Sequence, residues 1–534
     1  MAQQLQNLTI AAPGFFGINT QDSPIGIDPA YASIADNCVI DQFGRVGARQ
    51  GYQLVTTNGS SVLGTSRGIT GMLEYISRAN VTTVFSVGNL KIFTGTTTLV
   101  ECTLPAGYTI TDDDWRIISF NDDVYFFQDG HPPLKTKDTD VTELELLTTT
   151  GNGNGNGNGG GGGNGGGGFV PPPANEALAA YGRLWAADLP TNKYTVYWSD
   201  LLNGSDWHGN ASGSLDTTLV WPNGYDEIVA LAEHNNFLLI FGKKNILVYS
   251  GADNPNDPAF QLHDTIEGTG CIARDSIQST GTDLLFLSTR GLMSLGRLIQ
   301  EKSLPLRDVS RNVRTDLLNF VAIEEQSNGH RESIKSIYSP IDAFYLLTLP
   351  DSKVVYCFDV RQPLENGAFR VTTWTSLDPV AFCMFADDTL QMGHSEGIVK
   401  YKGYLDGTDT YQLRYFSNPS DFGNASNLKF LKKFNLTIIG AYATDITLNW
   451  GYDYTEAYTK QVLSFGTTNA IAEYGIAKYG IAEYSGGVDA LINTPSVNTG
   501  GSGTVVTIGL EAQVNGTSLS IQKIDIHALM GRLI

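Results

Sequence analysis

Short runs of apolar, β-branched and aromatic residues, separated by turn-forming residues, recur along most of the chain. The run FLLIF at 237–241 is followed by GKKN and then by ILVY at 246–249. Runs of this length and composition, bounded by Gly, Asp, Asn or Pro, are typical of β-strands. Similar runs lie at 81–87, 115–120, 124–127, 284–287, 344–349 and 354–358. The pattern predicts an all-β protein.

Neighbouring runs predict hairpins. The runs 237–241 and 246–249 are close enough to pair, and so are 344–349 and 354–358. Gly88 and Asn89 follow the run 81–87 and suit a two-residue turn with positive φ.

Helical periodicity is scarce. The best candidate is 303–320, where apolar residues recur at helical spacing, and 31–37 is a shorter one.

A unit of two or three strands with tight turns recurs about seven times, at spacings of roughly 25–50 residues. Repeats of this size in an all-β chain predict a β-propeller, here with about six or seven blades. Stacked sandwiches and a β-helix are the rival architectures, and the uneven spacing argues against the β-helix. The units lie at 67–102, 114–137, 175–207, 225–262, 273–297, 332–374 and 379–405.

Three regions follow from this repeat. Residues 1–66 are rich in turns and predict an extended N-terminal arm that enters the first blade. Residues 67–405 form the propeller. Residues 406–534 contain alternating strands, such as KFLKKFNLTII at 429–439, and predict a C-terminal β-sandwich-like domain.

Two low-complexity segments interrupt this organisation. Residues 151–168 contain only Gly and Asn, which favours an exposed loop inserted into the propeller. Residues 471–485 read IAEYG, IAKYG, IAEYS, a period that matches neither helix nor strand. Each is either a tolerated insertion or a contact surface, and the sequence leaves both roles open.

The charge balance restricts the partners. The chain has 34 Lys and Arg against 55 Asp and Glu, a net charge of −21. This argues against a surface that grips phosphates, although DNA that slides without sticking stays compatible. No apolar run is long enough for a membrane span, and no basic stretch followed by an apolar one predicts a signal peptide. The cysteines never form a CxxC pair and predict reduced core thiols; they are Cys38, Cys102, Cys271, Cys357 and Cys383.

No motif predicts catalysis. HExxH, P-loop and EF-hand patterns are absent, and the seven histidines are dispersed. The paired carboxylates Asp112–Asp114, Asp122–Asp123 and Asp387–Asp388 precede strands, so we interpret them as solvated turns rather than acid/base pairs. The sequence therefore nominates no catalytic, cofactor-binding or metal-binding residue, and predicts a protein that is not an enzyme.

The segment 15–52 resembles the opening of the tail nozzle proteins of short-tailed bacteriophages, also called tail tubular protein B or packaged-DNA stabilisation protein. Its shared pattern is Gly44, Arg45, Gly47, Arg49 and Gly51. The segments 178–189, 196–207, 227–252 and 268–297 are similar to that family's blades in the same order. The last of them carries a link with Gly270, Ala273, Ser276 and Ile277. The likeness covers about 15–405 and omits the Gly/Asn tract.

This resemblance implies a structural component of a podovirus virion tail. Nozzle proteins form a homo-hexamer below an adaptor protein, line the distal conduit for double-stranded DNA and ejected proteins, and offer a docking surface for tail fibres or spikes. It also implies synthesis in the host cytoplasm. Two alternatives stay open, a carbohydrate-active propeller and a receptor-binding tail protein. The first would need a buried carboxylate pair at the propeller axis.

Overall fold

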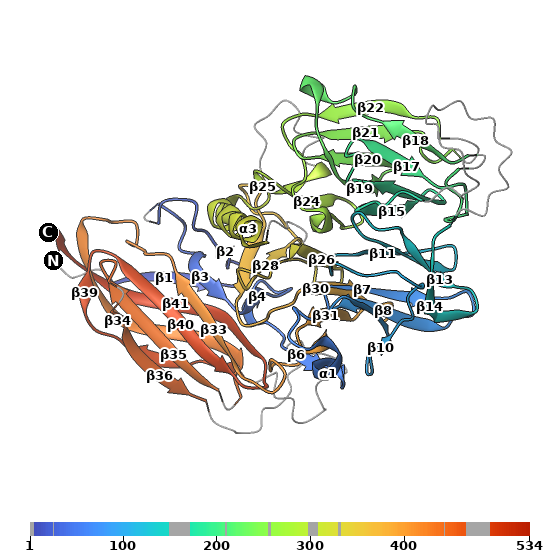
Figure 1. Cartoon of the computed structure of the whole chain (residues 1–534). Helices are drawn as coiled ribbons and strands as arrows, with labels where there is room; N and C mark the ends of the chain where they lie inside the picture. Colours follow the sequence, from blue (N-terminus) through green and yellow to red (C-terminus); the bar gives the residue numbers. More distant parts are fainter. Residues whose placement is uncertain are drawn as a thin grey trace.

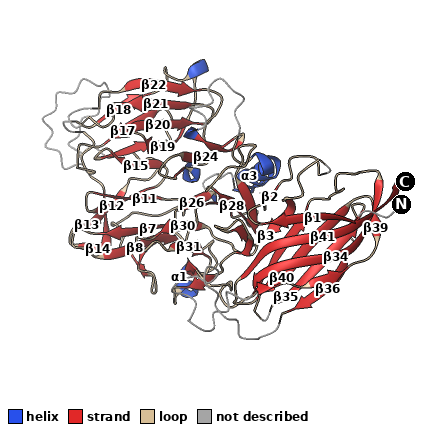
Figure 2. Cartoon of the chain, turned by 180° about the vertical axis from the view of Figure 1, so that it is seen from behind, coloured by secondary structure: helices blue, strands red, loops and turns tan. Residues whose placement is uncertain are grey.

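The computed structural model describes residues 5–24, 26–148, 171–208, 211–254, 258–296, 308–328, 333–442, 444–455, 457–465 and 492–533. Strands dominate both halves of the molecule (Figures 1 and 2), so the all-β prediction is confirmed. The Gly/Asn tract at 151–168 and the repeat at 471–485 lie outside the described residues.

Each of the repeat units predicted from the sequence overlaps the strands of one blade or sheet of the ring. Among the described residues, the β-propeller has six four-stranded blades: five are separate sheets, and the sixth, β26–β29, is part of a ten-stranded sheet. Strands β23 to β25 form a three-stranded sheet between two of the blades. Besides β6, which is described below, the strands of these sheets are β7 (Gly71–Ile76), β8 (Thr82–Gly88), β9 (Lys91–Thr94), β10 (Val100–Glu101), β11 (Arg116–Phe120), β12 (Asp123–Phe127), β13 (Leu134–Lys137), β14 (Asp140–Leu146), β15 (Glu176–Ala180), β16 (Arg183–Ala187), β17 (Thr195–Trp198), β18 (Gly213–Asp216), β19 (Ile228–His234), β20 (Phe237–Gly242), β21 (Ile246–Ser250), β22 (Gln261–Ile266), β23 (Gln278–Ser279), β24 (Leu284–Ser288), β25 (Gly291–Ser294), β26 (Lys335–Ser339), β27 (Phe344–Leu349), β28 (Val354–Asp359), β29 (Arg370–Trp374), β30 (Ala381–Met384), β31 (Leu390–His394) and β32 (Gly397–Tyr401).

The predicted hairpins are present in antiparallel register. Leu239 lies opposite Val248 in one, and Leu346 opposite Cys357 in another. The turn between β8 and β9 is shifted by one residue from the prediction. Asn89 and Leu90 have the positive φ values, while Gly88 still pairs with Lys91.

The ring closes with a strand from the N-terminal region. The first strands of successive sheets lie side by side, and β30 contacts β7, which joins the last blade to the first. The outer strand of the last blade is β6 (Tyr52–Leu54), which pairs with β32. Residues 1–66 thus differ from the expected arm, because β6 belongs to the last blade and not to the first. Closure by a distant strand removes a free sheet edge.

The C-terminal region forms two sheets around a common core, with β1 to β5 completing them. One sheet is built on the long strands β34 and β41, and β1 pairs with β41 along its whole length. The strands of this region are β1 (Leu5–Ala11), β2 (Gly17–Ile18), β3 (Tyr31–Asp36), β4 (Cys38–Ile40), β5 (Val46–Ala48), β33 (Tyr411–Ser417), β34 (Asn427–Gly440), β35 (Asp445–Tyr452), β36 (Thr459–Ser464), β37 (Ile492–Asn493), β38 (Ser496–Asn498), β39 (Ser502–Gly503), β40 (Val506–Val514) and β41 (Leu519–Leu533).

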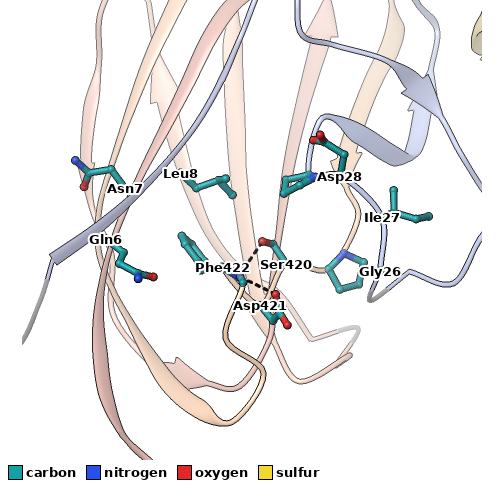
Figure 3. A pocket seen from close by; sticks show the side chains of 12 residues that line it. Gln6, Asn7, Leu8, Gly26, Ile27, Asp28, Ser420, Asp421 and Phe422 are labelled. Carbon is teal, nitrogen blue, oxygen red and sulfur yellow. Dashed lines mark hydrogen bonds between the residues drawn. The ribbon is translucent and has the colours of Figure 1, made fainter. Parts of the chain in front are cut away.

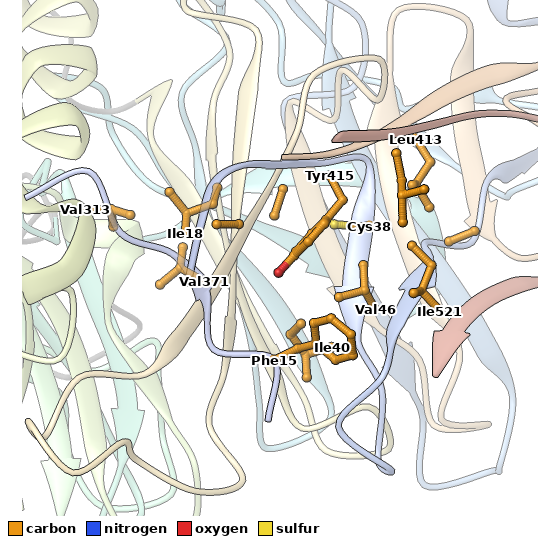
Figure 4. Close-up of a cluster of buried hydrophobic side chains, with 14 of the residues drawn as sticks. Phe15, Ile18, Cys38, Ile40, Val46, Val313, Val371, Leu413, Tyr415 and Ile521 are labelled. Carbon is orange, nitrogen blue, oxygen red and sulfur yellow. The ribbon is translucent and has the colours of Figure 1, made fainter. Parts of the chain in front are cut away.

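The propeller and the C-terminal sheets share one sheet and one core. Strand β29 pairs with β2 and β3, so the blade β26–β29 continues into a ten-stranded sheet that ends at β36. Phe15 and Tyr415 pack edge to face at this junction, beside Val371 from the blade (Figure 4). The blade β26–β29 and the C-terminal sheets therefore share one continuous hydrophobic core.

Helices are few and differ from the predictions. Within the described residues the helical elements are α1 (Gly59–Leu63), α3 (Arg314–Asn328) and the 3₁₀ turns η1 (Pro222–Gly224), η2 (Arg274–Ser276) and η3 (Arg311–Val313). The candidate at 303–320 overlaps only the start of α3, and 303–307 lie outside the described residues. The candidate at 31–37 is wrong, because 31–36 form β3. Pairing with β33 and β2 outweighs the local periodicity there.

Gly51 brings the closing strand against the end of the propeller. A Cβ atom on Gly51 would lie 1.9 Å from the carbonyl oxygen of Leu405. We expect Gly51→Ala to lower the free energy of unfolding by about 1–3 kcal/mol, because the backbones must separate. Thermal unfolding checks this. The control is Gly500→Ala, whose Cβ would meet nothing within 4 Å; equal midpoints for the two variants would contradict the packing argument.

Candidate functional site

Six charged residues meet where the inner strands of four sheets converge. We call them the axial ion cluster: Asp114, Arg116, Glu176, Arg274, Asp275 and Lys335. Arg116 begins β11 and Asp114 lies two residues before it, Glu176 begins β15, and Lys335 begins β26. Arg274 and Asp275 lie in η2, just before β23.

Arg274 lies at the centre of the cluster and is almost fully buried. Its Nη2 donates to Asp114 Oδ2 at 2.7 Å and to Asp275 Oδ2 at 3.1 Å. Its Nη1 donates to the backbone carbonyl of Asn175 at 2.6 Å. One guanidinium therefore ties η2 to the β11 and β15 blades.

Lys335 and Arg116 complete the ring of cations. Lys335 Nζ donates to Asp114 Oδ1 and to Asp275 Oδ2, both at 2.7 Å. Arg116 Nη1 donates to Asp275 Oδ1 at 3.1 Å, and its Nε donates to the carbonyl of Ala177 at 3.0 Å. Both oxygens of Asp275 are thus paired with cations. Burial opposes ionisation of Asp275, but Arg274, Lys335 and Arg116 together lower its pKa.

Glu176 differs from the other two carboxylates. It is 1% exposed, and its Oε1 accepts a hydrogen bond from the backbone N–H of Leu231 at 3.2 Å. Its Oε2 has no hydrogen-bond partner among the described residues and lies 3.8 Å from both Arg116 Nε and Arg274 Nε. Burial raises the pKa of Glu176 to about 7, against the opposing effect of the two arginines.

A small cavity of about 160 Å³ lies beside the cluster. Its walls come from β7, β11, β26 and β30, together with the segment that follows η2. Its charged lining residues are Arg116, Asp275 and Lys335. This cavity is far too small to admit a duplex.

The sequence interpretation of Asp114 as a solvated turn residue needs correction. Its side chain is 15% exposed and pairs with two cations of the cluster. Asp122, in contrast, lies in a turn with φ 74°, and Asp387 accepts hydrogen bonds from Thr389 in the turn before β31.

The other members of the cluster were missed by the sequence analysis. A signal existed, because each lies at the opening of a repeat unit, where inner strands of a propeller converge. Comparing equivalent positions of the units at 114–137, 175–207, 273–297 and 332–374 would have revealed a charged residue at each start.

Two further features of the described residues bear on function. All five cysteines are buried and free, which confirms their interpretation as core thiols. Within the described residues no group of His, Cys, Asp and Glu has the arrangement of a metal site, and no helix there has the length and apolarity to span a membrane.

A wider pocket of about 690 Å³ lies between β1, the 26–29 loop and the 419–423 loop (Figure 3). The carboxylates that line this pocket accept hydrogen bonds within their own turns: Asp28 accepts one from the N–H of Ala30, and Asp421 accepts one from the N–H of Gly423. The pocket therefore lacks a convergent set of uncommitted polar groups among its described lining residues.

Comparisons with known proteins find distant likenesses alone. No protein-family model and no curated protein matches the chain. A structure of YCF48 bound to a D1 peptide is 11% identical, covers 64% of this chain and 93% of its own, and has a TM-score of 0.35. PorZ of the type-IX secretion system of Porphyromonas gingivalis is 11% identical over 62% of this chain and 36% of its own, with a TM-score of 0.31. An exo-beta-1,3-galactanase from Phanerochaete chrysosporium is 11% identical, with coverages of 90% and 100% and a TM-score of 0.25. Likenesses this distant carry no argument about function.

Proposed function

We propose that this chain is the nozzle protein of a short-tailed bacteriophage, a structural component of the virion tail that assembles as a homo-hexameric ring. The observation that carries the proposal is the place of the resembling motifs in the fold. They form two junctions on which the architecture depends.

The first motif ends at the junction between the propeller and the C-terminal sheets. Arg49 is fully buried and donates to Asp406 through Nη1 at 2.8 Å and through Nη2 at 2.6 Å. Its guanidinium carbon lies 4.1 Å from the centre of the Tyr411 ring. Gly51 then allows the close approach of the closing strand. The residues of this motif therefore occupy positions whose geometry permits little substitution.

The second motif leads into the axial ion cluster. A Cβ on Gly270 would lie 2.3 Å from the carbonyl oxygen of Gly242. Ser276 Oγ donates to the carbonyl of Ala273 at 2.6 Å and accepts the N–H of Leu287 at 3.0 Å, which holds η2 in place. The motif thus positions Arg274 and Asp275 at the axis.

Charge and axial packing support a conduit between subunits. Ion pairs join charged side chains from different sheets of the propeller, so we place the DNA channel between several copies arranged around a common axis. With a net charge of −21 per chain, a channel between copies would repel phosphates, so DNA would pass without specific binding. An adaptor ring above and tail fibres or spikes outside are the partners that this function requires, with synthesis in the host cytoplasm.

A carbohydrate-active propeller is the less supported alternative. Carboxylates do meet at the axis, but Asp114 and Asp275 are paired with cations, and Glu176 does not line the cavity. A glycosidase needs an acid and a base that reach the sugar. No such observation opposes the receptor-binding alternative. The assembly state of the purified chain distinguishes it from the nozzle function.

The test is the assembly state of the purified full chain, alone and with the adaptor protein of the same phage. We expect a sixfold ring with a central hole in electron-microscope class averages, with the mass of six chains by light scattering. An unrelated ring protein of similar size is the control for non-specific association.

A second readout addresses the conduit. The assembled ring is expected to leave duplex DNA unbound even at low salt, whereas a basic lumen would bind it tightly there. A monomer that persists with the adaptor present would overturn the proposal, and polysaccharide cleavage and receptor binding would then be measured. Tight binding of duplex DNA at low salt would overturn the acidic conduit, but not the assembly of the ring.

A further inference from the structure

We propose that the axial cavity is a binding site for a small oxyanion, of carboxylate or sulfate size, with Arg116 as its principal ligand. The inference is independent of the nozzle function. It rests on the cavity, on the unused donors that line it, and on the charge of the cluster behind them.

The cavity has room for such a ligand. Its volume of about 160 Å³ corresponds to roughly five water molecules at ~30 Å³ each. This is enough for one planar or tetrahedral oxyanion with part of its hydration shell, and too little for a nucleotide or a disaccharide.

Arg116 offers a free edge of its guanidinium. Its Nε and Nη1 are occupied by Ala177 and Asp275, while its Nη2 donates to no residue in the described part of the chain. Arg116 is also the most exposed member of the cluster, at 31% of its side chain, and it lines the cavity. An arginine fixed on one edge and open on the other is well suited to a planar or tetrahedral oxyanion.

The other charged lining residues favour an anion over a cation. Lys335 Nζ uses two of its three N–H groups, on Asp114 and Asp275, and keeps one. Asp275 would oppose an anion, but its Oδ1 accepts from Arg116 and its Oδ2 accepts from Lys335 and Arg274. Two cations thus face the cavity with one neutralised carboxylate, and a metal ion would be repelled.

The protonation state of Glu176 makes anion binding at this site depend on pH. Facing it are Arg116 from β11, Arg274 and Asp275 from η2, the nearby Cys271 thiol, and the N–H of Leu231 from β19. With Glu176 ionised, the cluster holds three cations and three carboxylates; with Glu176 protonated, it carries one excess positive charge. Protonation of Glu176 therefore favours the bound anion, and a bound anion favours that proton.

Isothermal titration calorimetry of the full chain with sodium sulfate tests the site, because sulfate does not titrate between pH 6 and 8. Sodium chloride at equal ionic strength is the reference ligand, and sodium acetate is the carboxylate probe. We expect saturable sulfate binding at pH 6 and a dissociation constant that rises by up to about tenfold at pH 8.

Two variants make the test specific. Arg116→Met should weaken sulfate binding at least tenfold, while Arg78→Met, an arginine 72% exposed on another loop, should leave it unchanged. Glu176→Gln should keep sulfate binding and lose its pH dependence. If Arg116→Met is poorly folded, Arg116→Lys should fold, since it keeps the charge, and should weaken binding by removing the planar donor edge.

Absence of saturable sulfate and acetate binding to the wild-type chain at pH 6 would overturn the proposal. Equal sulfate affinity in Arg116→Met and the wild type would also overturn it. Retention of the full pH dependence in Glu176→Gln would overturn the link to Glu176.

Discussion

Arg49→Met is expected to lower the free energy of unfolding by about 3–5 kcal/mol, because it leaves the Asp406 carboxylate buried without its cation. Arg49 is fully buried and Asp406 is 9% exposed. The guanidinium also donates to the side chains of Asn37 and Ser376, at 3.1 and 2.7 Å. One substitution therefore removes the contacts that join the N-terminal region, the last blades and the strand that begins the C-terminal sheets.

Urea unfolding followed by tryptophan fluorescence checks this expectation, with Trp374 close to the junction: its indole N–H donates to the carbonyl of Cys38 at 3.0 Å. Arg49→Lys should fall between the wild type and Arg49→Met, since the ammonium keeps the charge and loses the bidentate geometry. Arg78→Met is the control, with an expected change close to zero. A loss no greater than that of the control would show that the junction does not depend on this ion pair.

The blades could be predicted from the sequence because each is a local structure. Hairpins such as β20–β21 and β27–β28 join segments a few residues apart, so their apolar runs and turn residues are visible side by side. The same reasoning located every repeat unit. The C-terminal sheets were predicted as a class for the same reason, from the alternation in β34 and β40.

The contribution of the N-terminal region could not be predicted in this way. Strand β1 pairs with β41, more than 500 residues away, and β6 pairs with β32. The region 1–66 is rich in turns because its strands are short and change sheets. The local sequence pattern therefore predicted an extended arm. The strands of this region are instead stabilised by pairing with strands that are distant in the sequence.

The axial ion cluster was missed for a related reason. Arg116, Glu176 and Lys335 begin strands, Asp114 precedes one, and Arg274 and Asp275 lie in η2. Charges at such positions are usually solvated. Propeller closure places the starts of β11, β15 and β26 next to η2, and this turns separate charges into a paired set. Asp114 shows the difference clearly, since its neighbours Asp112 and Asp113 serve nearby backbone N–H groups while Asp114 pairs with Arg274 and Lys335.

Glu176→Gln is expected to stabilise the protein at pH 8 by up to about 3 kcal/mol and to change it little at pH 5. Burial raises the pKa of Glu176 from its ordinary value of 4.5 to about 7, so the folded protein holds this proton more tightly than the unfolded chain does. Stability from this group is therefore lost as the pH rises from about 4.5 to about 7. A pKa difference of one unit corresponds to about 1.4 kcal/mol, and glutamine keeps the neutral form at every pH.

Urea titrations of Glu176→Gln and the wild type between pH 5 and 8, in chloride buffers without sulfate or carboxylates, measure this difference. Glu101→Gln is the matched control, because Glu101 is 53% exposed beside Lys91 and should leave the pH profile unchanged. If glutamine destabilised the protein equally at pH 5 and pH 8, Glu176 would be ionised throughout and the cluster would be a neutral, fully paired set. If the stabilisation appears at pH 8 alone, the cluster gains a positive charge on protonation, as the oxyanion site requires.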